Sequence, residues 1–458
     1  MILEGIIQDK KNFFWTVFHV ILGAICTLTP YALIIWFYFI FVSNFNKALV
    51  SLNKKKVFFF LLLFFYLISF ELLDRMAKTS PFLPYELGKY FLVILGLLGV
   101  LTLGAKNTKG ILLVLLITPA VFYDLSGQVV GADIINTFLA PLSIGIGFTF
   151  LSRLEISQGE LNQLLKVLWL TCLSSLVFTM IKTPDLDDLS FSLKAQFSTT
   201  GGHSSNQVST ILGFGVFLSF FSIYKKLKFS GYITLDYLFM FLFIWQGLLS
   251  FSRGGMVVGV LGLGILLFEK IRANIKRSIG IAILSSGVLI GTFSIADNLT
   301  GGLLLLRYQG ETEGTLAGSK EKNSDVFTSG RVGIFNGDID LWMDSPIFGV
   351  GCGASRYLRE SEYDGNVAAH IEFSRLLAEQ GLFGLLYFIL LLFVVWEAFK
   401  KIKDPQIKAI ILALVFIAIA TSFHAAMRTY VTPMLLLISV IRIKTIKLDE
   451  KNSLYRGG

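Results

Sequence analysis

Residues 385–396, LLYFILLLFVVW, form an uninterrupted apolar run, and the stretch AAHIEFSRLLAEQGLFG at 368–384 leads directly into it. Together with its apolar flanks, this run predicts a membrane-spanning helix. The preceding stretch holds a histidine, two glutamates and an arginine, and ionisable groups so close to hydrocarbon usually face a protein interior or an aqueous cavity. What these groups do depends on the side of the membrane on which they lie.

The composition of the whole chain favours a membrane protein. The 458 residues are 54% hydrophobic and only 16% charged, and the mean hydropathy is +0.71. Soluble domains are about a quarter charged, so a polytopic integral membrane protein is the better interpretation. The net charge of +9 does not predict a nucleic-acid partner, because the lysines fall in short clusters between apolar runs, as topology determinants do.

Repeated apolar runs predict an all-α polytopic fold with about 12–14 transmembrane helices and one large extracytoplasmic loop. We divide the chain into N-terminal helices over 1–296, the large loop over 297–370, and C-terminal helices with a tail over 371–458. Pro30 interrupts the first long run, which favours a tight hairpin of two helices there. The candidate spans are 12–27, 30–46, 57–73, 88–105, 110–125, 131–152, 163–181, 206–224, 232–251, 254–269, 277–296, 372–398, 407–424 and 428–442.

The lysine and arginine clusters set the orientation of these spans. Basic residues gather in alternate short loops, for example at 54–56, 225–228 and 400–403. By the positive-inside rule both termini are cytoplasmic and the large loop is outside. That loop carries six Lys and Arg against eleven Asp and Glu. The first apolar run lacks a cleavage pattern and is expected to remain as a span.

With this orientation, most of the unusual polar residues lie on the outer side. They are His203, Arg253, Arg331, His370, His424 and Arg428. A proton-coupled transporter would instead place carboxylates near the midplane. The chemistry is therefore expected at the outer surface of the membrane.

Structural roles for these residues compete with functional ones. Glu372, Arg375 and Glu379 share a helix face, so they form intrahelical salt bridges or position a ligand. His370 could simply cap a helix. Arg253 could be an interfacial arginine, but the two glycines that follow it allow close approach of backbone or ligand, which favours function. The cysteines at 26, 172 and 352 are too dispersed to predict a metal site or a structural disulfide.

Four motifs, in this order, resemble the O-antigen ligase/O-antigen polymerase family of bacterial envelope glycosyltransferases. They are SRGG at 252–255, SGR at 329–331, the turn PIFGVGCGASRYL at 346–358 and HIEFSRLLAEQGLFG at 370–384. The likeness is firmest over about 250–385 and looser at GGHSSNQVSTILGFG, 201–215. Family members often have Asn after the histidine, where this chain has Ile371. That departure leaves open which group orients His370.

The resemblance implies a transferase in the bacterial inner membrane with its active site facing the periplasm. The donor would be a glycan linked to undecaprenyl diphosphate, and the acceptor a hydroxyl of a glycan or a lipid core. Arg253 and Arg331 would bind the diphosphate, because arginine binds phosphate oxygens with two parallel hydrogen bonds. His370, with an ordinary pKa of about 6.5, would be the base.

The remaining expectations follow from the same resemblance. Arg375, Glu372, His203, His424 and Arg428 would position substrate. Neither a metal nor a cofactor is expected. Membrane lipids surround the chain, and a chain-length regulator is a further candidate partner.

Two other classes of function stay open at this level. A protein O-oligosaccharyltransferase would use the same donor and share the motifs. A flippase or exporter of lipid-linked glycan would need a charged central cavity and repeat symmetry, and the sequence shows no internal repeat. An uncatalytic envelope scaffold would tolerate alanine at His370 and at both arginines.

Overall fold

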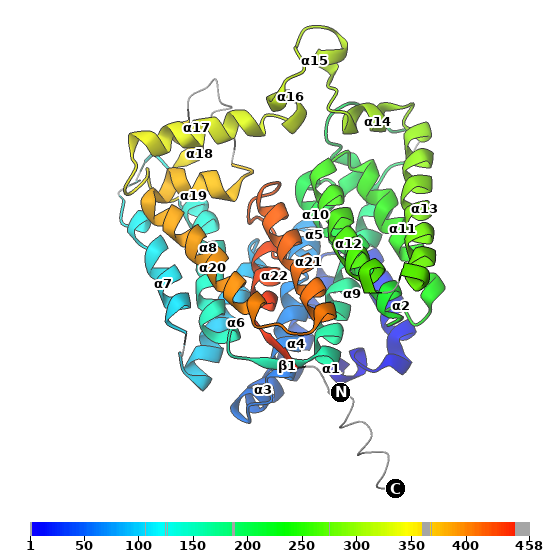
Figure 1. Cartoon of the computed structure of the whole chain (residues 1–458), viewed down its shortest axis with the longest axis vertical. Helices are drawn as coiled ribbons and strands as arrows, with labels where there is room; N and C mark the ends of the chain where they lie inside the picture. Colours follow the sequence, from blue (N-terminus) through cyan, green and yellow to red (C-terminus); the bar gives the residue numbers. More distant parts are fainter. Residues whose placement is uncertain are drawn as a thin grey trace.

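The computed structural model describes residues 2–105, 107–123, 125, 127–185, 188–273, 275–359, 367 and 369–444. Its elements are almost all helices, most of them running side by side between two ends of the molecule (Figure 1). This confirms the predicted all-α polytopic class. Among the described residues, eight helices are long and apolar enough to cross a membrane, and three shorter apolar helices accompany them at 87–103, 108–121 and 233–249.

The N-terminal half contains α1 (Ile2–Ile6), α2 (Asn12–Cys26), α3 (Tyr31–Asn53), α4 (Val57–Ile68), α5 (Glu71–Ala77), α6 (Leu87–Leu103), α7 (Thr108–Ile117), α8 (Gly131–Leu151), α9 (Gln158–Lys182), α10 (Ser205–Lys225) and α11 (Ile233–Leu249). Then follow α12 (Arg253–Ala273), α13 (Ile275–Leu299), α14 (Leu303–Tyr308), α15 (Glu313–Leu316), α16 (Ser324–Thr328), α17 (Arg331–Asp344), α18 (Ser355–Leu358), α19 (Glu372–Gln380), α20 (Leu382–Lys400), α21 (Pro405–Ser422) and α22 (Val431–Ser439). The predicted hairpin around Pro30 is confirmed, since α2 ends before it and α3 begins directly after it.

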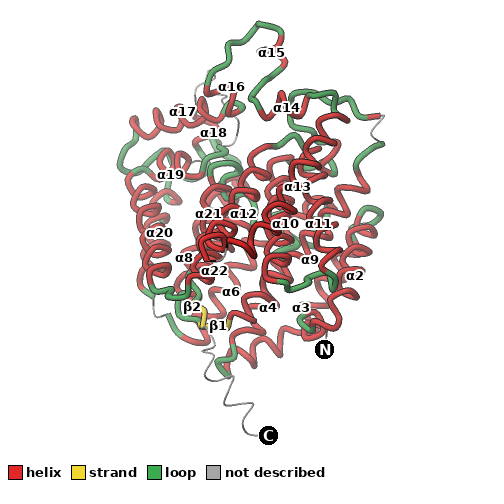
Figure 2. The backbone as a smooth tube through the Cα atoms, turned by 45° about the vertical axis from the view of Figure 1, so that its right-hand side comes forward, coloured by secondary structure: helices red, strands yellow, loops and turns green. Residues whose placement is uncertain are grey.

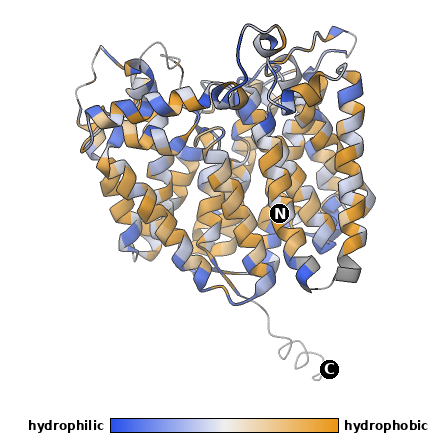
Figure 3. Cartoon of the chain, turned by 45° about the horizontal axis from the view of Figure 1, so that its top comes forward, coloured by the Kyte–Doolittle hydropathy of each residue, from blue (hydrophilic) through white to orange (hydrophobic). Residues whose placement is uncertain are grey.

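The two ends of the bundle differ. Helices α14 to α18, from the large loop, cross one end, and α1 lies at the opposite end (Figure 1). There, β1 (Glu155–Ser157) pairs in parallel with β2 (Arg442–Lys444), as Figure 2 shows. In Figure 3 apolar residues dominate the long helices and hydrophilic residues gather at the two ends. This distribution is the one that a bilayer around the bundle requires.

The predicted span 372–398 is wrong in one respect, because the chain breaks at Gly381. That glycine has φ +59° and ψ −136°, a conformation in which a side chain is strongly disfavoured. A Cβ there would also lie 2.6 Å from the backbone of Ile347 and of Gly349. The turn at 346–353 thus packs on the end of α19, and Val350 N donates to Ala378 O at 2.8 Å. Glu372, Arg375 and Glu379 consequently lie on a short separate helix and not on a membrane span.

Small residues bring α10 and α12 into close contact. A Cβ on Gly213 would lie 2.1 Å from the carbonyl oxygen of Gly255. A Cβ on Gly259 would lie 2.3 Å from the carbonyl oxygen of Gly213. Glycine and other small residues allow this approach between helices in membranes. The contact fixes the start of α12, and therefore Arg253 and Gly254, against the polar start of α10.

Candidate active site

The polar segment before α19 is joined to the turn between α21 and α22 through the backbone. Ala426 N donates to His370 O at 2.9 Å, and Arg428 Nη2 donates to Ala369 O at 2.6 Å. Met427 N donates to Glu372 at 3.2 Å. These bonds bring His370, His424 and Arg428 to the end of the bundle that carries the large loop, although more than fifty residues separate the two segments.

His424 lies between α12 and α17. Its ring packs so closely on Gly254 that a Cβ there would lie 2.1 Å from Nδ1. The same Nδ1 is 3.3 Å from Nη2 of Arg331. Because arginine only donates hydrogen bonds, Nδ1 of His424 must accept. The glycine of the SRGG motif therefore gives room to a histidine that orients Arg331.

Three arginines converge beside this contact. Arg253 donates to Arg307 O at 2.9 Å and to Ser329 Oγ at 3.2 Å, and Arg307 donates to the same hydroxyl at 3.3 Å. Arg331 donates to Thr328 O at 3.0 Å. Among the described residues, none of the three forms an ion pair with a carboxylate. Burial and, to a smaller extent, the charges of Arg253 and Arg331 lower the pKa of Arg307 to about 10.

His370 lies in the field of Arg331 and of two further arginines, Arg428 and Arg359. Burial lowers its pKa to about 3, and the charges of Arg428, Arg331, His424 and Arg359 act in the same direction. The imidazole is therefore neutral at pH 7. Its buried Nδ1 has no hydrogen-bond partner in the part of the chain that the structure describes. A neutral imidazole with an unpaired nitrogen is able to accept a proton from a hydroxyl brought to it.

Of the two alternatives left open for α19, the structure shows the intrahelical salt bridges. Arg375 Nη1 contacts Glu379 at 2.6 Å, and Nη2 contacts the carboxylate of Glu372. Both carboxylates are almost fully buried. Arg375 thus has its charge already neutralised within its own helix, which sets it apart from Arg253, Arg307 and Arg331.

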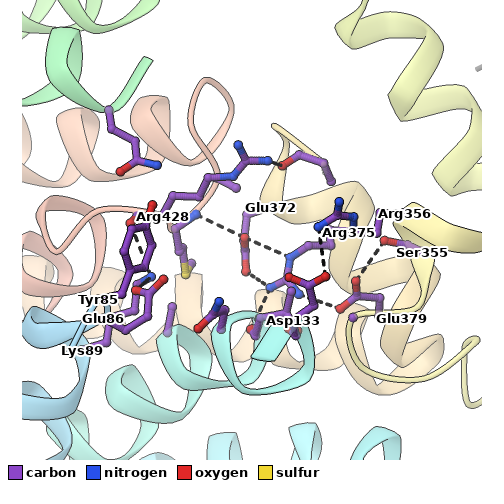
Figure 4. Close-up of a pocket in the computed structure, with 18 residues that line it drawn as sticks. Tyr85, Glu86, Lys89, Asp133, Ser355, Arg356, Glu372, Arg375, Glu379 and Arg428 are labelled. Atoms are coloured by element: carbon purple, nitrogen blue, oxygen red, sulfur yellow. Dashed lines mark hydrogen bonds and ion pairs between the residues drawn. The ribbon is translucent and has the colours of Figure 1, made fainter. Parts of the chain in front are cut away.

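A polar cavity of about 220 Å³ lies beside α19. Figure 4 shows Tyr85, Glu86 and Lys89 on one of its sides and Asp133, Arg356 and Glu379 on the other. Arg428, Glu372 and Arg375 also line this cavity. His203 does not line it, but it contacts the lining residues Gln207, at 3.3 Å, and Tyr85, through its ring.

An apolar cavity of about 350 Å³ lies among α11, α12, α13 and α14. It is lined by Val257, Leu261 and Ile290, all exposed on the outside of the bundle, and by Tyr308. Burial raises the pKa of Tyr308, and the nearby charges of Arg253 and Arg307 oppose that rise. Tyr308 therefore joins the apolar cavity to the arginines.

Sequence reasoning missed Arg307, Asn136 and Gln207. Arg307 belongs to no motif and only follows the apolar stretch LLLL at 303–306. Gln207 falls in the loosely similar stretch 201–215, where it was not distinguished from its neighbours. No group of three or more His, Cys, Asp or Glu within the described ranges could hold a metal ion.

These features define the chain as a polytopic all-α membrane protein with a cation-rich site at one end of its bundle. A family model described as O-antigen ligase matches residues 238–389. Over these residues the chain is similar to the O-antigen ligase/polymerase family, as its motifs predicted. The matched region includes Arg253, Arg307, Arg331 and His370 but neither His424 nor Arg428. No curated protein and no solved structure matched the chain.

Proposed function

We propose that the protein transfers or polymerises a glycan from an undecaprenyl-diphosphate-linked donor onto a hydroxyl of a glycan or a lipid core. The reaction is proposed to occur without a metal ion, at the periplasmic face of the bacterial inner membrane. The family match supports a ligase or polymerase activity in general. The donor, the acceptor and the orientation are our proposals.

The observation that carries the donor assignment is the position of three arginines beside an apolar cavity. The charge of Arg253 lowers the pKa of both Arg307 and Arg331. The three side chains contact backbone carbonyls and a hydroxyl instead of carboxylates. A ligand with two phosphates would relieve that repulsion and accept several charge-assisted hydrogen bonds. The apolar cavity that reaches Tyr308 would take a hydrocarbon chain attached to those phosphates. An anionic head with an apolar tail is the chemistry of a lipid diphosphate.

The proposed step uses these residues in separate roles. The acceptor oxygen forms a new bond to the anomeric carbon of the donor. The bond from that carbon to the phosphate oxygen breaks, and its electron pair leaves with the lipid diphosphate. The arginines stabilise the negative charge on this leaving group, and the acceptor's proton passes to His370.

Binding of the donor would also strengthen the base. The low pKa of His370 comes first from burial and then from four neighbouring cationic or ionisable groups. Opposite charge on the donor offsets the effect of those cations, so the pKa rises when the diphosphate is bound. His370 would become a useful base only in the complex in which a base is needed.

The fold supports the proposed orientation. The polar site lies among α12, α14, α17 and the turn before α22, at the end that holds the large loop. The lysine-rich segments at 54–56 and 400–403 lie at the C-terminal ends of α3 and α20, at the end of the bundle opposite to the large loop. Basic residues at that end favour a cytoplasmic location for it.

Lysine substitution at the arginines tests the donor assignment. Arg253→Lys and Arg331→Lys keep the charge but lose the planar fork, so we expect affinity for undecaprenyl diphosphate and turnover to fall about 10- to 100-fold. The measurement is the Kd for undecaprenyl diphosphate in nanodiscs, together with release of the lipid from glycan donor extracted from the host. Arg272→Lys, an exposed change on the same helix α12, is the matched control. Unchanged affinity in both variants would remove the basis for a diphosphate donor.

A further inference from the structure

The polar cavity and the arginine cluster lie on different sides of one short segment. Ala369 and Glu372 line the cavity, but His370 between them does not. The side chain of His370 lies instead within the electrostatic influence of Arg331 and His424. Arg428 belongs to both sides, since it lines the cavity and acts on His370. A group in the cavity is therefore separated from one bound at the arginines by little more than His370 and its neighbours.

Most of the ionised groups of the cavity wall form ion pairs. Arg375 is held by Glu372 and Glu379, and Arg356 lies 3.0 Å from Asp133. A second buried network joins Glu86 to Lys89 and, at 2.8 Å, to Arg75. Buried charges paired in this way form a stable framework, and separating them to bind an ion would be costly. The cavity thus offers a nearly neutral lining, in contrast to the unpaired arginines.

Two neutral amides in the wall keep hydrogen-bonding groups unused among the described residues. Gln207 is 6% exposed, and its Oε1 accepts from Arg75 Nη1 at 2.7 Å and contacts His203. Its Nε2 has no hydrogen-bond partner among the residues that the structure describes, and Gln207 lines the cavity. The amide of Asn136 on α8 likewise makes no hydrogen bond within the described chain. Gln207 is deeply buried, and a buried amide is normally satisfied, so its Nε2 points to a ligand with hydroxyl or carbonyl partners. The half-buried Asn136 offers a second amide to the same cavity.

We infer that this cavity binds a neutral sugar ring of the acceptor glycan, an assignment that rests on the proposed function. Amide donors and acceptors suit hydroxyl groups, and the ring of Tyr85 adds an apolar surface to the lining. The volume of about 220 Å³ is below the roughly 300–1,000 Å³ of drug-sized sites, so the cavity takes one ring at a time. A hydroxyl of that ring would extend past Ala369 to His370.

Saturation-transfer NMR on the full protein in nanodiscs tests this site. The probes are free D-glucose, D-galactose, N-acetylglucosamine and L-rhamnose, with undecaprenyl diphosphate as the anionic ligand. We expect at least one sugar to bind, and Asn136→Leu to weaken that binding at least tenfold, because leucine keeps the bulk but not the hydrogen bonds. The affinity for undecaprenyl diphosphate should not change. Ala132→Leu, one turn earlier on α8 and outside the cavity, is the control and should behave as the wild type.

A second variant guards against misfolding of the first. Gln207→Glu keeps an oxygen for Arg75 but has no amide donor, so it too should weaken sugar binding. Unchanged sugar binding in both variants, or no binding of any of the four sugars to the wild type, would overturn the assignment. If Arg253→Lys and Arg331→Lys leave the affinity for undecaprenyl diphosphate unchanged, the proposed function is overturned instead.

The acceptor and the donor's own sugar are distinguished by a competition. In His370→Ala, where transfer is blocked, a sugar linked to undecaprenyl diphosphate should bind together with the free sugar. Displacement of the free sugar would show that the cavity holds the donor's sugar, which contradicts our assignment. Signals that persist with the donor present support an acceptor site.

Discussion

Replacing Gly254 by alanine should disable the site without unfolding the protein. The new Cβ would lie 2.1 Å from Nδ1 of His424, against an ordinary contact distance of 3.4 Å or more. Because the start of α12 is fixed against α10, the ring has to move by roughly 1.3 Å. Its contact with Arg331, now 3.3 Å, would be lost, and the guanidinium would lose its orientation. Misplacement of a catalytic group by about 1 Å costs on the order of 100-fold in rate.

The assay is the turnover number for release of undecaprenyl diphosphate, with the yield of monodisperse protein as the readout for folding. Gly254→Ala should lower turnover about 100-fold at normal yield. In Gly255→Ala, the added Cβ would lie 2.3 Å from the backbone of Ser209, so the yield should fall. In Gly264→Ala nothing lies within 4 Å of the new atom, and both readouts should stay normal.

A double variant identifies the ring as the cause. If the clash acts only through His424, then Gly254→Ala combined with His424→Ala should have the activity of His424→Ala alone. Wild-type turnover in Gly254→Ala would refute the reasoning. A double variant much less active than His424→Ala would also refute it, because the added methyl group would then disturb something other than His424.

Three further predictions concern His370 and topology. His370→Ala should accumulate lipid-linked glycan and lower the rate about 10²–10⁴-fold at a normal protein level. In the wild type, activity should be lost as pH falls through the pKa of His370. The value of kcat should fall at a higher pH than kcat/KM, because kcat reports the donor-bound enzyme and kcat/KM reports the free enzyme, in which the pKa is about 3. If kcat and kcat/KM fall at the same pH, the pKa of the base does not rise on donor binding. A reporter that works only in the cytoplasm should be active when it is fused after residue 455. Activity of a reporter that works only on the outer side would contradict the proposed orientation.

Much of the fold could be predicted from hydropathy. Long apolar runs have few alternatives to helices in a bilayer, because every backbone group must find a partner within the chain. The hairpin at Pro30 followed from the loss of a backbone donor. The break at Gly381 did not, because the pattern of residues 372–398 suits a continuous helix. The turn at 346–353, which packs on the end of α19, favours the break, and no local sequence signal reports that contact.

The motifs also predicted part of the candidate site. Arg253, Arg331 and His370 stood out because ionisable groups near a membrane are rare and costly. Their neighbours could not be found in this way. Arg307 looked like an ordinary loop residue. For Arg375 the sequence left salt bridges and ligand positioning open, and only the structure showed its ion pairs with two glutamates.

The sequence by itself determined the class of the protein, the approximate positions of its helices and the three residues on which the proposed chemistry centres. Only the tertiary structure decided which helices meet. Membrane helices are apolar on all sides, so periodicity does not indicate which face contacts which neighbour. The contact of His424 with Gly254, some 170 residues away, depends on small residues that let α10 and α12 approach. The same packing separates unpaired arginines from a cavity of paired charges, because whether a buried charge is neutralised is decided by its neighbours in space and not by its neighbours in the chain.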